Sequence, residues 1–373
     1  MANALFARRA RLQSIAALQV RPASSGDPLA VTGIRAWALR EPGSGRRYTV
    51  VRLETRTGMR GYGECGEAPA HELALVREAI VGQPASAYET AWERMAAAPR
   101  LRAAINMAQL DLLGQAAKAP VFQVLGGPTR AKARALAPLD GPAALERAQN
   151  RGFRAFSAAA PVNEFRNAGK SYVASVALMM QRLRGAAGEG NDFVLDGGGR
   201  LVAGDAQSLA AELESFHMLW FDEPCRLSGL GAVKKIARES VTPLGFGRDI
   251  ADAGGFQDLL REDAVDILRP SLATHGISAI RRIAALAETY YIAVAPYHDG
   301  GPIATAAALH LAASIPNFFI QQIPFPASPA DVEMRQQIAN VETVREGFLA
   351  LPDLPGLGLR INEAILDRYQ ERA

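Results

Sequence analysis

Three short apolar runs, each ending at acidic or charged residues, recur at near-equal intervals in the middle of the chain. They are Phe193–Asp196, Leu219–Pro224 and Pro243–Asp249, and helical patterns over residues 206–216 and 229–239 separate them. Strand, helix and strand at this spacing indicate parallel strands joined by crossover helices, so the strands all end on one side. The charged groups at these ends are therefore expected to converge where barrel enzymes hold their chemistry.

The same strand-then-helix unit continues on both sides of this stretch. Most intervals are roughly 20–30 residues, the size of a βα unit. Because there are eight such strands with intervening helices, we predict an α/β fold built on a modified (β/α)8 barrel of the TIM type. The candidate strands are Ala135–Pro138, Phe153–Ala158, Phe193–Asp196, Met218–Phe221, Pro243–Phe246, Ala264–Leu268, Ile292–Ala295 and Phe318–Gln321.

The region before this repeat has a different order of elements. Alternating runs at Val31–Trp37 and Tyr48–Glu54 read as strands, and helical patterns follow them. Strands first and helices after indicate a separate α+β unit. We therefore predict a basic tail or decayed export leader at 1–28, an α+β domain at 29–130, a barrel at 131–325 and a C-terminal segment at 326–373 that returns to the first domain.

The composition restricts the partners of the chain. A length of 373 residues with 49% hydrophobic and 21% charged residues suits a soluble globule of one large and one smaller domain. The net charge of +3 and the lack of a basic patch argue against nucleic acid. No apolar run reaches the ~18 residues of a membrane helix. Arg8 and Arg9 begin a stretch like a twin-arginine leader, so a periplasmic location is the alternative to the expected cytoplasmic one.

A set of short motifs resembles the enolase superfamily, in its mandelate racemase and muconate lactonizing enzyme subgroup. The likeness extends over about residues 30–360, and the order and spacing of the motifs carry it. The matching motifs are Gly61–Glu64, Ala108–Gly114, Leu125–Gly127, Phe221–Pro224, Asp266–Pro270, Gly276–Ser278, Ala285–Glu288 and Gly300–Ile303.

This resemblance implies a fold and a chemistry. It implies that the α+β domain caps a modified barrel, and that three acids after the third, fourth and fifth barrel strands hold Mg²⁺. Family members remove the proton next to a carboxylate while the metal stabilises the enediolate, because that proton is too weakly acidic for a side-chain base alone. The resemblance also implies a small carboxylate or acid-sugar ligand, dehydratase or racemase activity, and a homo-oligomer.

The three metal positions are only partly kept in this sequence. Asp196 and Asp222 occupy the first two, with Asp222 shorter by one methylene than the usual Glu. The third falls on Arg248, whose guanidinium cannot bind a cation and would repel one. Asp249 is adjacent and would need a local bulge to take the place of Arg248.

The base positions have also changed. Ser157-Ala158-Ala159 stands where relatives have Lys-x-Lys, Ser271 stands where they have Asp, and Tyr297 stands where they have His. His298 comes one place later, and Gln322 replaces an acid that often ends the eighth strand. Ser157, Ser271 and Gln322 are expected to contact a ligand through their polar groups.

Several readings of these substitutions follow. For the metal positions, one interpretation is that Arg248 pairs with Asp196 and Asp222. The other is that a weak Mg²⁺ site persists on Asp196, Asp222 and Asp249. His298 is a base displaced by one place and oriented by Asp299, or a solvated loop residue. The protein is accordingly a descendant that has lost metal-assisted proton abstraction and binds a carboxylate, a pseudoenzyme, or alternatively a divergent Mg²⁺-dependent dehydratase or racemase. Metal-free chemistry on Tyr297, His298 and Arg248 is a third hypothesis.

Overall fold

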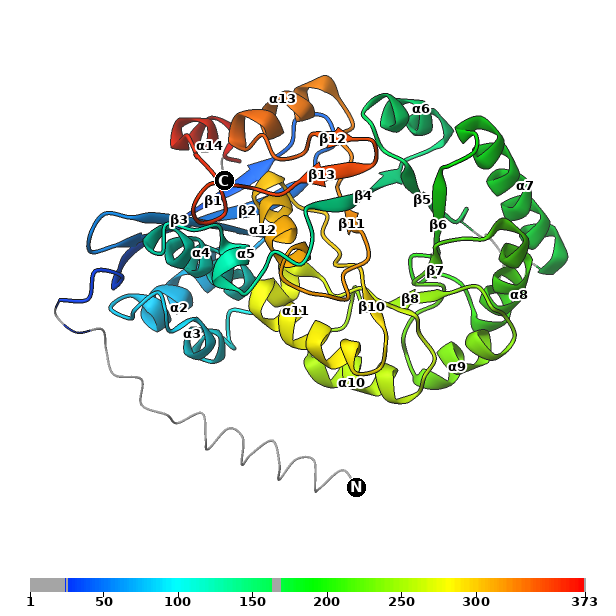
Figure 1. The fold of residues 1–373 in the computed structure, drawn as a ribbon, viewed down its shortest axis with the longest axis horizontal. Coiled ribbons are helices and arrows are strands. Elements are labelled where there is room, and N and C mark those ends of the chain that lie inside the picture. The colour runs from blue at the N-terminus through cyan, green and yellow to red at the C-terminus, as the bar shows by residue number, and fades with distance from the viewer. Residues whose placement is uncertain (1–23, 25, 163–168, 372–373) are drawn as a thin grey trace.

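The computed structural model describes residues 24, 26–162 and 169–371, so most of the leader-like N-terminal stretch lies outside the described residues. A small sheet with its helices lies beside a ring of strands and outer helices (Figure 1). In the described ranges, none of the helices combines the length and the apolar character needed to cross a membrane.

The small sheet is antiparallel and three-stranded, in the order β1-β2-β3. The long helix α4 packs across β3, and two glycines of β3 allow this close approach. A Cβ atom at Gly63 would overlap the carbonyl oxygen of Ala104, and one at Gly61 would overlap that of Ala108. The elements are β1 (Val31–Arg40), β2 (Arg47–Thr55), β3 (Arg60–Cys65), α2 (Ala70–Ile80), α3 (Tyr88–Arg94), α4 (Leu101–Ala116) and α5 (Val121–Val124).

The second sheet forms the barrel. Neighbouring strands from β4 to β10 pair in parallel and in chain order, and β11 pairs with β4. Between β10 and β11 a single bridge, Val294 to Phe318, stands in place of a continuous ladder. The strands are β4 (Lys132–Leu139), β5 (Ala155–Ala159), β6 (Asp192–Asp196), β7 (Trp220–Asp222), β8 (Leu244–Phe246), β9 (Ile267–Leu268), β10 (Ala293–Val294) and β11 (Gln321–Gln322). The predicted TIM-like barrel with a capping domain is confirmed, with this incomplete closure.

Helices surround the strands because each buries one apolar face against them. In α9, for example, Val233 and Ile236 are buried while Lys234 and Lys235 are partly or fully exposed. The interior of the ring is filled by residues from successive strands, namely Leu136, Ala155, Val194, Trp220, Ile267, Ala295 and Ile320. The helices are α6 (Pro142–Asn150), α7 (Gly169–Ala187), α8 (Ala203–Leu213), α9 (Leu230–Arg238), α10 (Ala253–Arg261), α11 (Leu272–Glu288) and α12 (Pro302–Ala312), with a 3-10 turn at Glu214–Phe216.

The C-terminal segment contacts both parts of the molecule. It comprises α13 (Pro329–Ile338), β12 (Val344–Arg345), β13 (Phe348–Ala350) and α14 (Glu363–Tyr369). β13 pairs antiparallel with β4 and so extends the barrel sheet. Beyond β13, the backbone N–H of Leu357 donates to Asp111 Oδ1 at 2.8 Å, and Trp37 Nε1 donates to Asp367. These contacts hold the chain end on the capping domain.

Candidate functional site

The ends of three parallel strands bring charged side chains together. β6 ends at Asp196 and β7 ends at Asp222, and the sheet register places these two residues side by side. Arg248 follows the third strand, β8, by two residues. The crossover connections make all these ends point to one side of the barrel, as the sequence pattern predicts.

The Arg248 guanidinium lies against both acids. Its Nη1 donates to Asp196 Oδ2 at 3.0 Å, and its Nη2 donates to Asp196 Oδ1, so the pair is bidentate. Nη2 is also 3.5 Å from Asp222 Oδ2. Burial would lower the pKa of Arg248, but Asp222 and Asp196 raise it above its ordinary value. Arg248 is therefore a permanent cation at the point where the three strand ends meet.

A second arginine holds Asp222 from inside the barrel. Arg269 is fully buried, and its Nε donates to Asp222 Oδ1 at 3.1 Å. Its Nη1 donates to the carbonyl of Ala295 at 2.7 Å, and its Nη2 donates to Gln322 Oε1 at 2.8 Å. Arg269 was not among the predicted site residues, although it lies within the motif Asp266–Pro270 on which the family resemblance partly depends. Two arginines thus compensate the two aspartates.

Glu223 fixes the backbone that carries Arg248. The carboxylate Oε1 of Glu223 accepts from the N–H groups of Gly247 at 2.7 Å and Arg248 at 2.8 Å. Glu223 itself has a φ of 40°, which is uncommon for a residue with a side chain. Burial and then Asp222 raise the pKa of Glu223 to about 7. The strained residue therefore orients the turn after β8.

The donor set does not suit a divalent cation. Asp249, the alternative third ligand, is exposed and lines a groove of about 770 Å³ with Glu223 and Cys225, whereas Asp196 and Asp222 do not line this groove. The backbone turns at Gly247, where φ is 133°, so Arg248 and not Asp249 is directed to the two acids. Across the described ranges, no three or more acidic, His or Cys side chains cluster in a way that could hold a metal.

Two of the three expected ligand contacts border these charges, namely Gln322, which accepts from Arg269, and Ser271. Ser157 is buried in β5, and Ser271 is buried where it bridges to Tyr297. The Tyr297 ring contacts both guanidinium groups, with its centroid 5.1 Å from Arg248 Cζ and 5.6 Å from Arg269 Cζ. Burial and then Asp299 raise the pKa of Tyr297 to about 12, so the phenol stays protonated near neutral pH.

His298 lies in a different environment from the one expected. It is 1% exposed, so its interpretation as a solvated loop residue is wrong. Its Nε2 is 3.4 Å from Thr305 Oγ1. Because the single hydroxyl hydrogen of Thr305 is donated to Glu342 at 2.6 Å, the imidazole N–H is the donor to Thr305. Its Nδ1 has no hydrogen-bond partner in the described part of the chain. Burial lowers the pKa of His298 to about 3, which keeps the ring neutral.

Comparison with known families matches both parts of the chain. The description "Mandelate racemase / muconate lactonizing enzyme, N-terminal domain" matches residues 40–126, and "Enolase C-terminal domain-like" matches residues 142–365. A D-galactonate dehydratase of Ralstonia pickettii is 30% identical over 358 residues, which are 87% of this chain and 92% of that protein. One of Pectobacterium atrosepticum is 28% identical over 88% of this chain and 92% of that protein.

Solved structures share the same architecture. A mandelate racemase/muconate lactonizing enzyme-like protein of Rubrobacter xylanophilus has a TM-score of 0.82 and 25% identity, covering 92% of this chain and 98% of that one. An enolase of Agrobacterium radiobacter, solved with sodium and L-malate bound, also has a TM-score of 0.82 at 25% identity, covering 91% of this chain and 95% of that one.

Proposed function

The chain belongs to the mandelate racemase/muconate lactonizing enzyme family of the enolase superfamily, and we propose that it has lost the metal-assisted proton abstraction of that family. In this proposal the barrel is a non-catalytic binder of a small carboxylate or acid sugar. The observation that carries it is the bidentate pair between Arg248 and Asp196, with Asp222 3.5 Å from the same guanidinium nitrogen.

The positive charge of Arg248 repels a cation bound at Asp196 and Asp222. At 4 Å and an effective dielectric constant of 20, a guanidinium repels a divalent ion by roughly 8 kcal/mol. A metal would also have to replace the two charge-assisted hydrogen bonds between Arg248 and Asp196. Because Arg269 also donates to Asp222, a metal would have to share this acid with a second guanidinium.

The side chains at the base positions that the family resemblance assigns, and His298 beside them, are not suited to act as bases. The pKa of Tyr297 is raised to about 12, so the phenol keeps its proton at neutral pH. The hydroxyl groups of Ser157 and Ser271 do not titrate near neutral pH. Neutral His298 is buried, and its Nε2–H is engaged by Thr305. These groups can donate to or accept from a ligand, but none is suited to remove a weakly acidic carbon-bound proton.

A carboxylate ligand remains compatible with the strand ends. The side chains of Arg248 and Asp196 are 14% and 24% exposed, so both have a solvent-facing edge. A ligand carboxylate would share Arg248 with Asp196, and Ser157, Ser271 and Gln322 are the proposed contacts for its hydroxyl groups. Because Arg248 is already compensated, we expect weak binding of such a ligand.

A second candidate is a divergent Mg²⁺-dependent acid-sugar dehydratase. The 30% identity to a D-galactonate dehydratase over 87% of this chain favours it. Under this hypothesis Arg248 moves away from Asp196 when metal and substrate bind, and the partial exposure of both side chains leaves room for that movement.

Titration of Mg²⁺ by calorimetry separates the two candidates. We expect no binding to the wild-type protein at millimolar Mg²⁺, whereas Arg248→Glu should gain a site and a rise in melting temperature, because a ligand of the folded state stabilises it. The control is Arg226→Glu, which makes the same charge change on an exposed residue of the preceding loop and should not bind.

Two other results distinguish a dehydratase from a binder. Mg²⁺ binding by the wild-type protein that Asp196→Asn abolishes, together with loss of water from D-galactonate to give a 2-keto acid, would establish the dehydratase. A melting-temperature rise with D-galactonate that is lost in Arg248→Gln, without turnover, is the result expected for a binder.

A further inference from the structure

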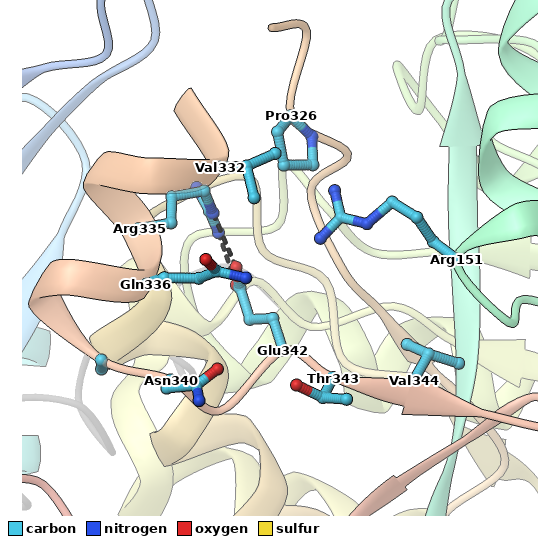
Figure 2. A pocket seen from close by; sticks show the side chains of 10 residues that line it. Arg151, Pro326, Val332, Arg335, Gln336, Asn340, Glu342, Thr343 and Val344 are labelled. Carbon is cyan, nitrogen blue, oxygen red and sulfur yellow. Dashed lines mark hydrogen bonds and ion pairs between the residues drawn. The ribbon is translucent and has the colours of Figure 1, made fainter. Parts of the chain in front are cut away.

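A pocket outside the strand-end site lies between α13 and the barrel. Its volume is about 200 Å³, and one wall is α13 with the segment that follows it, while Arg151, between α6 and β5, forms the opposite wall. Figure 2 shows Arg151 extending toward the ion pair of Arg335 and Glu342 from across this space. Chain segments far apart in sequence therefore enclose it.

The charges of the pocket leave one cation uncompensated. Arg335 is buried and donates to both oxygens of Glu342, at 2.7 Å and 2.6 Å, and also to Glu41. Glu41 in turn pairs with Arg46 at 2.7 Å. This network holds two positive and two negative charges and is balanced. Arg151 has no ion pair or hydrogen bond through its side chain within the described residues, and its Cζ lies 5.3 Å from the centroid of the Phe325 ring.

Burial adds to the cost of this unbalanced charge. It lowers the pKa of Arg151, although Glu342 nearby raises it. Glu342 Oε1 accepts from Arg335 and Thr305, and Oε2 accepts from Arg335, so three of the about four acceptor sites of this carboxylate are in use. Within the described residues, Arg151 does not donate to the remaining site. A half-buried guanidinium beside a cavity is thus left with unused donors.

Neutral polar groups and four apolar residues form the rest of the pocket wall. Gln336, Asn340 and Thr343 line the pocket, are exposed to solvent, and make no side-chain hydrogen bond within the described ranges. In Figure 2 the side chains of Asn340 and Thr343 face one another across the floor. Amides and a hydroxyl can donate to an anion and also accept from its hydroxyl groups. The site is therefore open to a ligand and lined by groups that can bind oxygen atoms.

We propose that this pocket binds a compact oxyanion, with Arg151 as its charged anchor and Gln336, Asn340 and Thr343 as its neutral contacts. The planar guanidinium fork matches a carboxylate or a phosphate. The small volume favours a ligand of a few carbon atoms at most, below the range of ~300–1,000 Å³ that is usual for drug-sized molecules. Two kinds of ligand carry such an oxyanion group and are small enough, namely inorganic phosphate and a short hydroxy acid.

Calorimetric titration of the full chain at low ionic strength tests this proposal. The probes are inorganic phosphate, D-glycerate and neutral glycerol. We expect phosphate or D-glycerate to bind at millimolar concentration and to bind more weakly as salt is added, while glycerol does not bind. The stronger of the two anions identifies the source. Absence of binding by both anions would overturn the proposal.

Substitutions at matched positions show whether the anion binds in this pocket or at the strand ends. Arg151→Gln should weaken it at least about tenfold, as expected for loss of a charge-assisted hydrogen bond. Arg147→Gln is the control, because Arg147 also contacts the Phe325 ring but pairs with Asp140 and does not line the pocket. Asn340→Ala, an exposed change, should weaken binding without unfolding the protein. If Arg248→Glu abolishes the binding and Arg151→Gln does not, the anion binds at the strand ends and the proposal is wrong.

Discussion

At the scale of single residues, the buried ionisable groups at the junction of the two domains control the response to pH. Glu64 of β3 is fully buried, and it accepts from the N–H groups of Gly301 and, at 3.3 Å, Ala304 at the start of α12. Burial raises the pKa of Glu64 to about 8, although these backbone groups and Arg335 lower it. The carboxyl is therefore largely protonated in the folded protein at neutral pH.

The sign of the resulting pH dependence follows from this shift. Between its ordinary pKa of 4.5 and about 8, the folded state keeps the Glu64 proton that the unfolded state releases. Glu64 therefore makes the free energy of unfolding fall as pH rises through this window, by at most about 1.4 kcal/mol per pH unit for one proton. In Glu64→Gln this contribution is removed, and urea denaturation from pH 5 to pH 8.5 measures the difference.

Subtraction of the two profiles isolates Glu64 from other carboxyls that titrate in the same range, such as Glu223 and Asp111, whose pKa values burial raises to about 7 and about 6. Parallel profiles for the wild-type protein and Glu64→Gln above pH 6.5 would show that Glu64 is ionised in the fold.

At the scale of elements, the crossing of β3 and α4 sets how closely the capping sheet approaches its helix. Gly63 faces the backbone of α4, and a Cβ atom there would overlap the carbonyl oxygen of Ala104. Gly63→Ala should lower the free energy of unfolding by about 1–3 kcal/mol, because neither backbone can yield without moving the whole element.

The control for this substitution lies three residues further on. Gly66 has open space at its Cβ position and a φ outside the left-handed region, so Gly66→Ala should change the free energy of unfolding by less than about 1 kcal/mol. Denaturant unfolding of both variants measures the contrast. Equal stability of the two would mean that α4 moves freely against β3.

At the scale of the whole molecule, one buried arginine joins three distant segments. Arg335 of α13 donates to Glu41 in the turn after β1, to the carbonyl of Gly300 after β10, and to Glu342. Arg335→Met leaves Glu342 without its cationic partner, while Glu41 keeps Arg46. We expect a loss of about 3–5 kcal/mol in the free energy of unfolding, as for other broken buried pairs.

An ion pair on the surface provides the comparison. Arg282 of α11 pairs with Glu89 of α3, so it also joins the barrel to the capping domain, but both side chains are more than half exposed. Arg282→Met should cost at most about 1 kcal/mol, because solvent screens the pair. Urea denaturation of both variants checks the contrast, and a similar small effect in Arg335→Met would show that the carboxylates regain solvent.

Much of this architecture was predictable from local patterns. The candidate strands at residues 135–138, 193–196 and 243–246 overlap β4, β6 and β8, because apolar runs with turn residues at both ends specify buried strands. The family resemblance assigned Arg248 to the third metal position, and its place after the third of three parallel strands predicted that it lies near Asp196 and Asp222, as the distances between its guanidinium and the two acids show. Arg269 was missed, since one charged residue after a short apolar run does not reveal that its side chain reaches back into the barrel.

The sequence by itself determined the order of strands and helices, the side on which the strands end, and the residue types present there, because these depend on neighbours along the chain. Only the tertiary structure decided that Arg248 rather than Asp249 meets Asp196, that His298 is buried, and that Arg335 joins Glu41 across 294 positions of sequence. Side-chain direction at a turn and contact between distant segments depend on how whole elements pack, and no local pattern contains that information.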